Sequence, residues 1–433
     1  MSAPVRFGTD GIRGRAGEAV TEELAYRLGR AVATVFSVPA YVGYDTRASS
    51  PALAAAVLHG LYEGGAEAVN LGHFTTPGVA AIAQIRGGVG VVVSASHNPY
   101  YDNGLKVLGL GGAKLDLPTE SAVEEALASA PSSPREARPT PPVDGSAEAE
   151  YVAWLRARVP VDLSGLSIVL DCANGAASHV APALFAATGA RLEVIHDQPD
   201  GRNINDRAGS TDVTALVAAV TEHGADLGLA LDGDADRLIA VDADGAVRDG
   251  DDLLVLFALD RRARGELDGG IVVTTMSNLG LHRALGAAGV SVVETEVGDR
   301  NVLLALDERG WTIGGEQSGH LIFRDLAPTG DGLLTGLLLG ELVARRGPLG
   351  ALARDAWARV PQALVSLPRE SVDVAEVEQL FAREVDRHGL AAGESRLIVR
   401  LSGTEPVVRV MVEATDAALV EEYVAALAAI AHP

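Results

Sequence analysis

A serine and a histidine come directly after an apolar run, and these residue types are suited to nucleophilic chemistry. The run, Val89 to Val93, has valine at four of its five positions, which predicts a buried parallel strand. Small and polar residues follow, and Asn98 and Pro99 then indicate a turn. Ligands of an open α/β sheet bind at the carboxyl ends of its strands, so Ser96 beside His97 is a candidate nucleophile. The segment by itself is explained equally well by a serine-rich turn with a capping hydroxyl.

Three aspartates at alternating positions form the strongest metal-binding signal in the sequence. Asp232, Asp234 and Asp236 follow a short predicted strand, residues 226–231, and only glycine and alanine separate them. Without a cation the three carboxylates of such a tight loop would repel one another. Ligation by carboxylate oxygens alone favours Mg²⁺ over Zn²⁺, which prefers nitrogen and sulfur. An acidic surface turn remains an alternative, and Arg237 is suited either to neutralise one acid or to contact a phosphate.

Two glycine-containing loops carry groups that suit a charged or hydroxylated ligand. The first holds polar residues between glycines, as a sugar-binding loop would: Glu316, Gln317, Ser318 and His320. The second lies between two predicted strands near the C-terminus and combines an arginine, two hydroxyl residues and a glycine that frees backbone amides: Arg400, Ser402, Gly403 and Thr404. Such a set suits a dianionic phosphate, although the motif alone has only moderate specificity. A polar turn is the alternative for the first loop.

Two basic residues are weaker candidates for a phosphate site. Arg13 lies in the run from Phe7 to Gly14, where three glycines allow a close approach of backbone and ligand. Lys106 follows Asp102 to Gly104, a strong turn signal, and an amine beside a bound phosphate would hold charge or move a proton. Considered in isolation, a surface turn explains the first segment better, and an exposed, solubilising lysine explains the second better.

The elements that must position these groups alternate between strand and helix through most of the chain. Residues 21–36 and 51–64 have helical patterns, for example, and residues 41–45 between them have the pattern of a strand. This alternation predicts α/β layers, whereas the order of elements from about residue 361 onward predicts a small α+β domain. The proline-rich stretch 128–142 is the most linker-like segment. We expect domains at residues 1–142, 143–246, 247–358 and 359–433.

The composition indicates a soluble globular protein and excludes several classes of partner. The 433 residues are 48% hydrophobic and 21% charged, and the formal net charge is −23. Such a charge repels nucleic acid and anionic membranes, so neither is expected as a partner, and an anionic substrate needs local positive groups or a bound cation. Cys172 is the single cysteine, which rules out an intrachain disulfide. Since neither a signal-peptide pattern nor a long apolar run is present, we expect a cytoplasmic protein.

Five motifs occur together in an order and spacing that resemble the α-D-phosphohexomutase family. They are Phe7–Gly14, Ser94–Pro99, Asp232–Arg237, Gly315–His320 and Ser402–Pro406, and the match spans almost the whole chain. The resemblance implies an α/β fold of three related, mixed α/β domains with a smaller C-terminal α+β domain around a central cleft. It also implies an isomerase that moves a phosphoryl group between O6 and O1 of a hexose.

The resemblance assigns the phosphoryl group and the metal to particular residues. Ser96 would carry the phosphoryl group that is donated to the substrate. One Mg²⁺ per chain would bind this serine together with Asp232, Asp234 and Asp236. The small-molecule partner would be a sugar phosphate, with glucosamine 1,6-bisphosphate or glucose 1,6-bisphosphate as the activator.

The remaining roles implied by the resemblance concern protons and substrate contacts. Lys106 and His320 would act as acid and base, and Arg237 would offset negative charge in the site. The other contacts would be Arg13 and His97 with the reacting phosphate, Glu316 and Ser318 with sugar hydroxyls, and Arg400, Ser402, Gly403, Thr404 and Arg409 with the far phosphate.

Within the family, Gln317 and the loop Ser402–Pro406 resemble the glucosamine branch, which implies glucosamine phosphates as substrates and a place in amino-sugar and cell-wall precursor synthesis. A mutase of mannose or glucose phosphates with the same mechanism is the nearest alternative. A Mg²⁺-dependent sugar-phosphate phosphatase and a sugar-phosphate binding protein are the others. Ala235, where glycine is more usual, and Leu401, where a polar residue or proline is more usual, depart from the family pattern. Nothing in the sequence indicates the oligomeric state.

Overall fold

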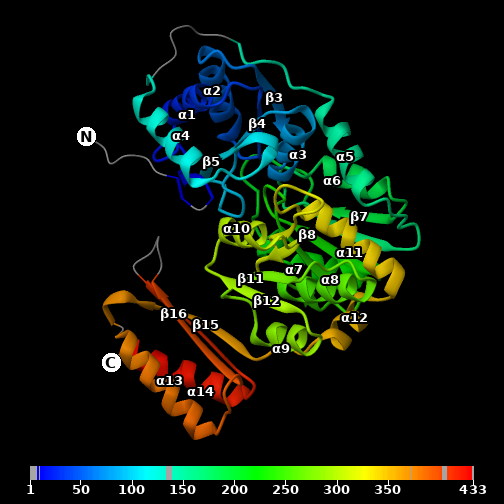
Figure 1. Ribbon diagram of the computed structural model, residues 1–433. Helices are drawn as coiled ribbons and strands as arrows, with labels where there is room; N and C mark the ends of the chain where they lie inside the picture. Colours follow the sequence, from blue (N-terminus) through cyan, green and yellow to red (C-terminus); the bar gives the residue numbers. More distant parts are fainter. Residues whose placement is uncertain (1–6, 9, 133–138, 372, 402–406, 432–433) are drawn as a thin grey trace.

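The structure is a computed structural model of the 433-residue chain and describes residues 7–8, 10–132, 139–371, 373–401 and 407–431. Three α/β units follow one another and a smaller α+β unit ends the chain, which confirms the predicted fold class (Figure 1). In Figure 1 the first unit, in blue and cyan, lies at the top, and the last, in orange and red, lies at the lower left. No helix in the described ranges has both the length and the apolar character needed to cross a membrane.

The first sheet has the order β1–β5–β4–β2–β3. Its strands are β1 Ile12–Arg15, β2 Ala40–Tyr44, β3 Ala68–His73, β4 Val89–Val93 and β5 Asp102–Leu108, and its helices are α1 Glu22–Val35, α2 Ser50–Glu63, α3 Thr76–Arg86 and α4 Leu117–Ser129. Threonine caps fix two helix starts, because Thr21 accepts a hydrogen bond from the N–H of Leu24 and Thr75 accepts one from Gly78. Strand β4 is buried throughout, parallel to β2 and antiparallel to β5. The prediction of parallel neighbours therefore holds on one side of β4 only.

The turn predicted at Asp102 to Gly104 is wrong, because these residues open strand β5. This strand pairs with β1 on one side and with β4 on the other. The Asn103 amide donates to the Ser50 hydroxyl over 3.0 Å. At Gly104 an added Cβ would lie 2.4 Å from the carbonyl oxygen of Ser94, so the glycine serves close packing rather than a turn. Tertiary pairing thus overrides the local preference of the sequence.

The second sheet repeats the arrangement of the first, and the third has the same arrangement without the outermost strand. The second has the order β10–β9–β8–β6–β7, with β6 Ser167–Asp171, β7 Arg191–Ile195, β8 Leu227–Leu231, β9 Leu238–Asp242, β10 Val247–Arg248, α5 Ala147–Arg158, α6 Val180–Ala186 and α7 Thr214–His223. The third has the order β12–β11–β13–β14, with β11 Gly270–Thr274, β12 Ser291–Thr295, β13 Ile313–Gly315, β14 Leu321–Phe323, α8 Gly250–Arg264, α9 Leu279–Ala287, α10 Asp299–Arg309, α11 Gly332–Arg346 and α12 Leu349–Ala356.

In each sheet three parallel strands are followed by an antiparallel one. The parallel sets are β3–β2–β4, β7–β6–β8 and β12–β11–β13, and the antiparallel strands are β5, β9 and β14. Three of the sequence motifs occupy the same connection in the three units, from the last parallel strand to its antiparallel neighbour: Ser94–Pro99, Asp232–Arg237 and Glu316–His320. Each motif therefore starts at the carboxyl end of a parallel strand, where open α/β sheets bind their ligands.

The fourth unit differs from the other three in topology and in its core. Its antiparallel sheet has the order β15–β17–β16, with β15 Gln362–Pro368, β16 Ser395–Leu401, β17 Val407–Ala414, α13 Val374–His388 and α14 Ala417–Ala431. One apolar core runs through the first three units and includes Val79, Leu229 and Phe257, whereas Val410 and Tyr423 belong to a separate core of the fourth. The first three units are thus bound together by a shared core.

Polar contacts join the fourth unit to the third. The Asn278 amide donates to the carbonyl oxygen of Val360 and accepts from its N–H, each over 2.9 Å. The Arg396 guanidinium contacts Glu294 at 2.6 Å, and Glu413 accepts a hydrogen bond from the N–H of Leu279 over 3.0 Å. These contacts fix the position of the fourth unit with directional bonds rather than with apolar burial.

Near this junction, Asp251 is buried at the start of α8, and we expect it to make the stability of the protein depend on pH. Burial, with help from Asp249, raises the pKa of Asp251 to about 7. Between its ordinary pKa and pH 7 the folded state holds a proton that the unfolded chain releases. The titration of Asp251 therefore lowers the free energy of unfolding by roughly 2 kcal/mol as the pH rises from 5 to 7. Above pH 7 the contribution of Asp251 changes little.

We expect Asp251→Asn to remove this contribution. The variant should unfold at a higher temperature than the wild type at pH 7.5, and the difference should shrink towards pH 5. Thermal unfolding followed by circular dichroism across this range tests the prediction. Asp268→Asn, at an exposed position in the same unit, is the control. An equal shift at both pH values would show that Asp251 is not the titrating group.

Candidate active site

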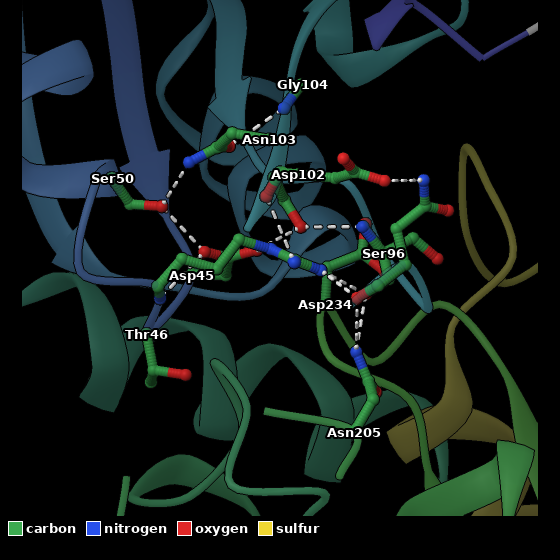
Figure 2. A network of polar contacts seen from close by, with 12 residues as sticks. Asp45, Thr46, Ser50, Ser96, Asp102, Asn103, Gly104, Asn205 and Asp234 are labelled. Carbon is green, nitrogen blue, oxygen red and sulfur yellow. Dashed lines mark hydrogen bonds and ion pairs between the residues drawn. The ribbon is translucent and has the colours of Figure 1, made fainter. Parts of the chain in front are cut away.

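Ser96 lies where the first and second units meet. It is fully buried, and its backbone φ of 51° falls in the left-handed region that L-residues seldom adopt. The Ser96 Oγ donates a hydrogen bond to Oδ2 of Asp232 over 2.6 Å and lies 3.2 Å from Nδ1 of His97. Figure 2 shows Ser96 among polar side chains that come from both units, Asp234 among them. One hydroxyl therefore joins two loops that are 136 positions apart in the sequence.

The three aspartates predicted to bind a metal lie together in the loop between β8 and β9. All three are buried, and one oxygen of each lies within 4.8 Å of the others. The Oδ1 atoms of Asp234 and Asp236 have no hydrogen-bond partner among the described residues. Burial, together with the charges of Asp236 and Asp234, raises the pKa of Asp232 well above its ordinary value. Buried carboxylates with unpartnered oxygens fit a hard divalent cation such as Mg²⁺.

The neighbours of the aspartates complete this loop. Ala235 has a φ of 59°, a conformation that glycine adopts more easily, but the alanine displaces none of the carboxylates. The N–H of Arg237 donates to Oδ1 of Asp232 over 3.2 Å, and the Nε of Arg237 lies 3.8 Å from Oδ1 of Asp236. Arg237 therefore supplies part of the positive charge that balances the acids.

Lys106 is buried beside the aspartates, so the interpretation as an exposed lysine is wrong. Its Nζ lies 2.8 Å from Oδ2 of Asp234, 3.1 Å from Oδ2 of Asp10 and 3.8 Å from Oδ2 of Asp236. The Thr76 hydroxyl donates to the same oxygen of Asp234 over 2.6 Å. Burial opposes the ionisation of Asp234, but Lys106 and this hydrogen bond outweigh burial and hold the pKa of Asp234 below its ordinary value.

His320, which belongs to the third unit, lies beside the same aspartates. Its Nδ1 lies 3.6 Å from Oδ2 of Asp236, and its Nε2 has no hydrogen-bond partner in the described part of the chain. Burial lowers the pKa of His320, but the charges of Asp236, Asp299 and Glu316 outweigh burial and raise it, which favours the protonated imidazole. Gly330 leaves room for the ring, since a Cβ there would lie 2.4 Å from Nε2.

A cleft lies beside these groups and is lined by some of them. Its inner part, of about 200 Å³, is lined by residues from all three α/β units, among them Arg13, His97, Arg237, Glu316 and His320. A wider part of about 710 Å³ shares His97, Arg237 and Glu316 with the inner part and extends to Arg409 of the fourth unit. Burial and the charges of Arg237 and Arg13 lower the pKa of His97 to about 4, so its imidazole is neutral at pH 7.

The sugar-loop residues line the wider part of the cleft. Glu316 is held by the N–H of Gly298, which donates to its Oε1 over 3.0 Å, and the Ser318 hydroxyl lies 3.4 Å from its Oε2. The amide nitrogen of Gln317 lies 3.3 Å from Oδ2 of Asp251 and 3.2 Å from Oε1 of Gln362. This loop therefore contacts both the cleft and the first strand of the fourth unit.

Two of the predicted phosphate contacts in the fourth unit face each other across adjacent strands. Arg400 on β16 and Arg409 on β17 are register partners, and Arg409 lines the cleft. The three other predicted contacts, Ser402, Gly403 and Thr404, lie outside the described residues.

Several residues of the site were not singled out from the sequence. Asp10 contacts Lys106, and Asp299 raises the pKa of His320, although neither was proposed for a role. Thr76, which bonds Asp234, comes shortly after the parallel strand β3, so the rule that ligands bind at strand carboxyl ends was a signal for it. Asp299 likewise comes shortly after the parallel strand β12, so the same rule was a signal for it.

Sequence profiles of four domain families match along the chain. They are described as phosphoglucomutase/phosphomannomutase alpha/beta/alpha domain I over residues 4–133, domain II over 149–245, domain III over 249–360, and the C-terminal domain over 364–430.

Individual proteins are similar over nearly the full length. A phosphoglucosamine mutase from Rhodococcus jostii is 46% identical over 430 residues, and one from Frankia casuarinae is 47% identical over 438 residues, each match covering 95% of both chains. A phosphoglucomutase/phosphomannomutase family protein from Burkholderia thailandensis has a TM-score of 0.80 at 25% identity, covering 99% of this chain and 97% of its own. An Aspergillus fumigatus N-acetylphosphoglucosamine mutase, solved with GlcNAc-6P and magnesium, shares the fold with a TM-score of 0.67 at 18% identity, covering 98% and 95%.

Proposed function

This chain belongs to the phosphoglucomutase/phosphomannomutase family, the α-D-phosphohexomutases, and we propose that it is a phosphoglucosamine mutase. It interconverts glucosamine 6-phosphate and glucosamine 1-phosphate. The observation that carries the proposal is the 2.6 Å hydrogen bond from the Ser96 Oγ to Asp232, beside a cleft whose inner part is lined by His97, Asp236 and His320. The substrate follows from relatives of that name at 46% and 47% identity over almost the whole chain, and from Gln317.

Asp232, Asp234 and Asp236 would hold one Mg²⁺ together with the phosphoryl oxygens on Ser96. When bound, the cation supplies positive charge that neutralises the phosphoryl group during transfer. Arg13 and His97 contact the same phosphoryl group from the inner part of the cleft. A bisphosphorylated sugar, glucosamine 1,6-bisphosphate or glucose 1,6-bisphosphate, phosphorylates Ser96 and so activates the enzyme.

The reaction moves a phosphoryl group twice. First a sugar hydroxyl attacks the phosphorus on Ser96, so that a new P–O bond to the sugar forms and the bond to Oγ breaks. The hydroxyl proton passes to a base, and Oγ takes a proton from an acid; Lys106 and His320 serve these roles. The 1,6-bisphosphate then reorients, and its other phosphoryl group returns to Oγ, which regenerates phosphorylated Ser96.

Substrate contacts in the other domains keep the sugar phosphate in the cleft during reorientation. Glu316 and Ser318 bind sugar hydroxyls, and the fourth domain binds the phosphate that is not reacting through Arg400, Ser402, Gly403, Thr404 and Arg409. We propose domain boundaries at residues 1–142, 143–246, 247–358 and 359–433, close to the ends of the matched family segments.

Phosphorus-31 NMR tests the proposed function directly. The protein is incubated with Mg²⁺, a trace of glucose 1,6-bisphosphate and glucosamine 6-phosphate, mannose 6-phosphate or glucose 6-phosphate. We expect a 1-phosphate resonance to grow fastest from glucosamine 6-phosphate. Faster conversion of another sugar would reassign the substrate, release of inorganic phosphate would indicate a phosphatase, and no conversion of any sugar would reject the mutase.

We expect Lys106→Met to reduce kcat by about 10²- to 10⁴-fold, because an acid–base group beside the aspartates is lost. The variant should also be less stable by about 3 kcal/mol, because a buried lysine no longer balances Asp234. Steady-state kinetics and urea unfolding measure the two effects. Arg261→Met is the matched control, since Arg261 is also buried and pairs with an aspartate, Asp325, and neither residue lines the cleft. Equal kcat values for the two variants would argue against proton transfer by Lys106.

A further inference from the structure

Arg47 binds the backbone of the Ser96 loop with its whole guanidinium group. The side chain is buried, and its Nε donates to Oδ2 of Asp45 over 2.8 Å. The two terminal nitrogens donate to four backbone carbonyl oxygens, those of Ser96 at 2.9 Å, Asn98 at 2.8 Å, Asp102 at 3.1 Å, and Pro99. All five N–H donors of the arginine are therefore used, three of them on the Ser96 loop and one on Asp102, where β5 begins. Lysine, with three donors on one atom, cannot make this set of bonds.

Asn205 reaches the same loop from the second domain. Its side-chain nitrogen donates to the carbonyl oxygen of Ser96 over 2.9 Å and to that of Asn98 over 3.3 Å. Figure 2 shows Asn205 reaching towards Ser96. The Ser96 carbonyl thus accepts one hydrogen bond from each of two domains. Gly233 of the aspartate loop packs against both groups, because a Cβ there would lie 2.6 Å from the Ser96 oxygen and 2.9 Å from the Asn205 nitrogen.

The N–H side of Ser96 is fixed as well. Its N–H donates to the Ser94 hydroxyl over 2.9 Å, and that hydroxyl donates to Oδ2 of Asp45 over 2.6 Å, the oxygen that also accepts from Arg47. A φ of 51° strains a serine, and such a conformation persists only where its surroundings enforce it. The conformation matters because it directs the Oγ of Ser96 towards Asp232.

We propose that Arg47 and Asn205 are positioning residues that together hold Ser96 in its left-handed conformation. Asn205 makes the geometry of the reacting serine depend on the docking of the second domain against the first. The same docking brings the aspartate loop to Ser96, so the nucleophile and the metal-binding carboxylates are set by one domain contact. The inference rests on the proposed function, because it concerns the serine that carries the phosphoryl group.

The test compares Asn205→Ala with Asn203→Ala in the full-length protein. Asn203 lies in the same loop, and its amide bonds the carbonyl oxygen of Gln198 rather than the Ser96 loop. We expect Asn205→Ala to lower kcat, and the rate at which glucose 1,6-bisphosphate phosphorylates Ser96, by about 10- to 100-fold. The KM, the Mg²⁺ dependence and the thermal midpoint should stay close to those of the wild type, as they should in Asn203→Ala. A general loosening of the structure would change all of these quantities together.

Hydrogen–deuterium exchange of residues 94–99 provides a readout that does not need turnover. Exchange should be faster in Asn205→Ala and in Arg47→Lys than in the wild type, and unchanged in Asn203→Ala. Wild-type kcat together with wild-type protection of this loop in Asn205→Ala would overturn the inference. An inactive wild-type protein would instead reject the proposed function, and the exchange comparison would still decide whether Asn205 holds the loop.

Discussion

Replacing Ser96 by alanine is expected to abolish mutase activity, with a loss of about 10⁴-fold or more. The variant lacks the oxygen that accepts and returns the phosphoryl group, and the neighbouring His97 and Asp232 cannot replace it. The variant should also take up no phosphoryl group from glucose 1,6-bisphosphate, which intact-protein mass spectrometry measures. Its fold should persist, because the substitution removes one buried hydroxyl and leaves the backbone bonds of the loop in place.

Ser178→Ala is the matched control for this experiment. Ser178 is also a buried serine, but its hydroxyl donates only to the local carbonyl oxygen of Gly175 over 2.7 Å. It should retain activity and should leave phosphorylation of the protein unchanged. Turnover by Ser96→Ala at a rate near that of the wild type would exclude a phosphoserine mechanism through this residue.

Asp232→Asn is expected to lower activity by about 10³-fold while raising the stability of the metal-free protein. The activity falls because one of three carboxylates proposed to bind Mg²⁺ is lost, and with it the charge that organises phosphoryl transfer. The stability rises because Asp232 is fully buried within reach of two more carboxylates, so its negative charge opposes folding when no cation is present.

Thermal unfolding in EDTA and in Mg²⁺ separates the two effects. The wild type should be stabilised by Mg²⁺ because a ligand that binds the folded state stabilises it by mass action, whereas Asp232→Asn should respond much less. Asp244→Asn, at an exposed acid in the next turn of the same domain, should behave as the wild type does in both buffers. An undiminished response of Asp232→Asn to Mg²⁺ would show that Asp232 is not a ligand.

The chemical groups of the site could be identified from the sequence because each occupies a short loop of unusual composition. The serine loop, the three aspartates and the sugar loop were predictable in this way, and the structure places one residue of each, His97, Asp236 and His320, in one cleft. The fold class was also predictable, since the alternation of strand and helix is a local pattern.

Local patterns failed where tertiary contacts decide the conformation. The turn signal at Asp102 to Gly104 opens a strand instead, because β1 and β4 pair with it on both sides. Lys106 had the sequence features of an exposed lysine, but its buried charge is paired with Asp10 and with Asp234, which approaches from the second domain. The equivalence of the three sheets became visible only in their strand order.

The sequence by itself determined which residues carry chemistry, and the tertiary structure decided which of them act on one another. The contacts that make the site join residues far apart in the chain: Ser96 and Asp232 are separated by 136 positions, Lys106 and Asp234 by 128, and Ser96 and Asn205 by 109. No local propensity encodes such pairs. They form because three domains share one apolar core and place the same loop of each sheet at a common cleft. At this cleft the buried acidic side chains pair with buried basic ones.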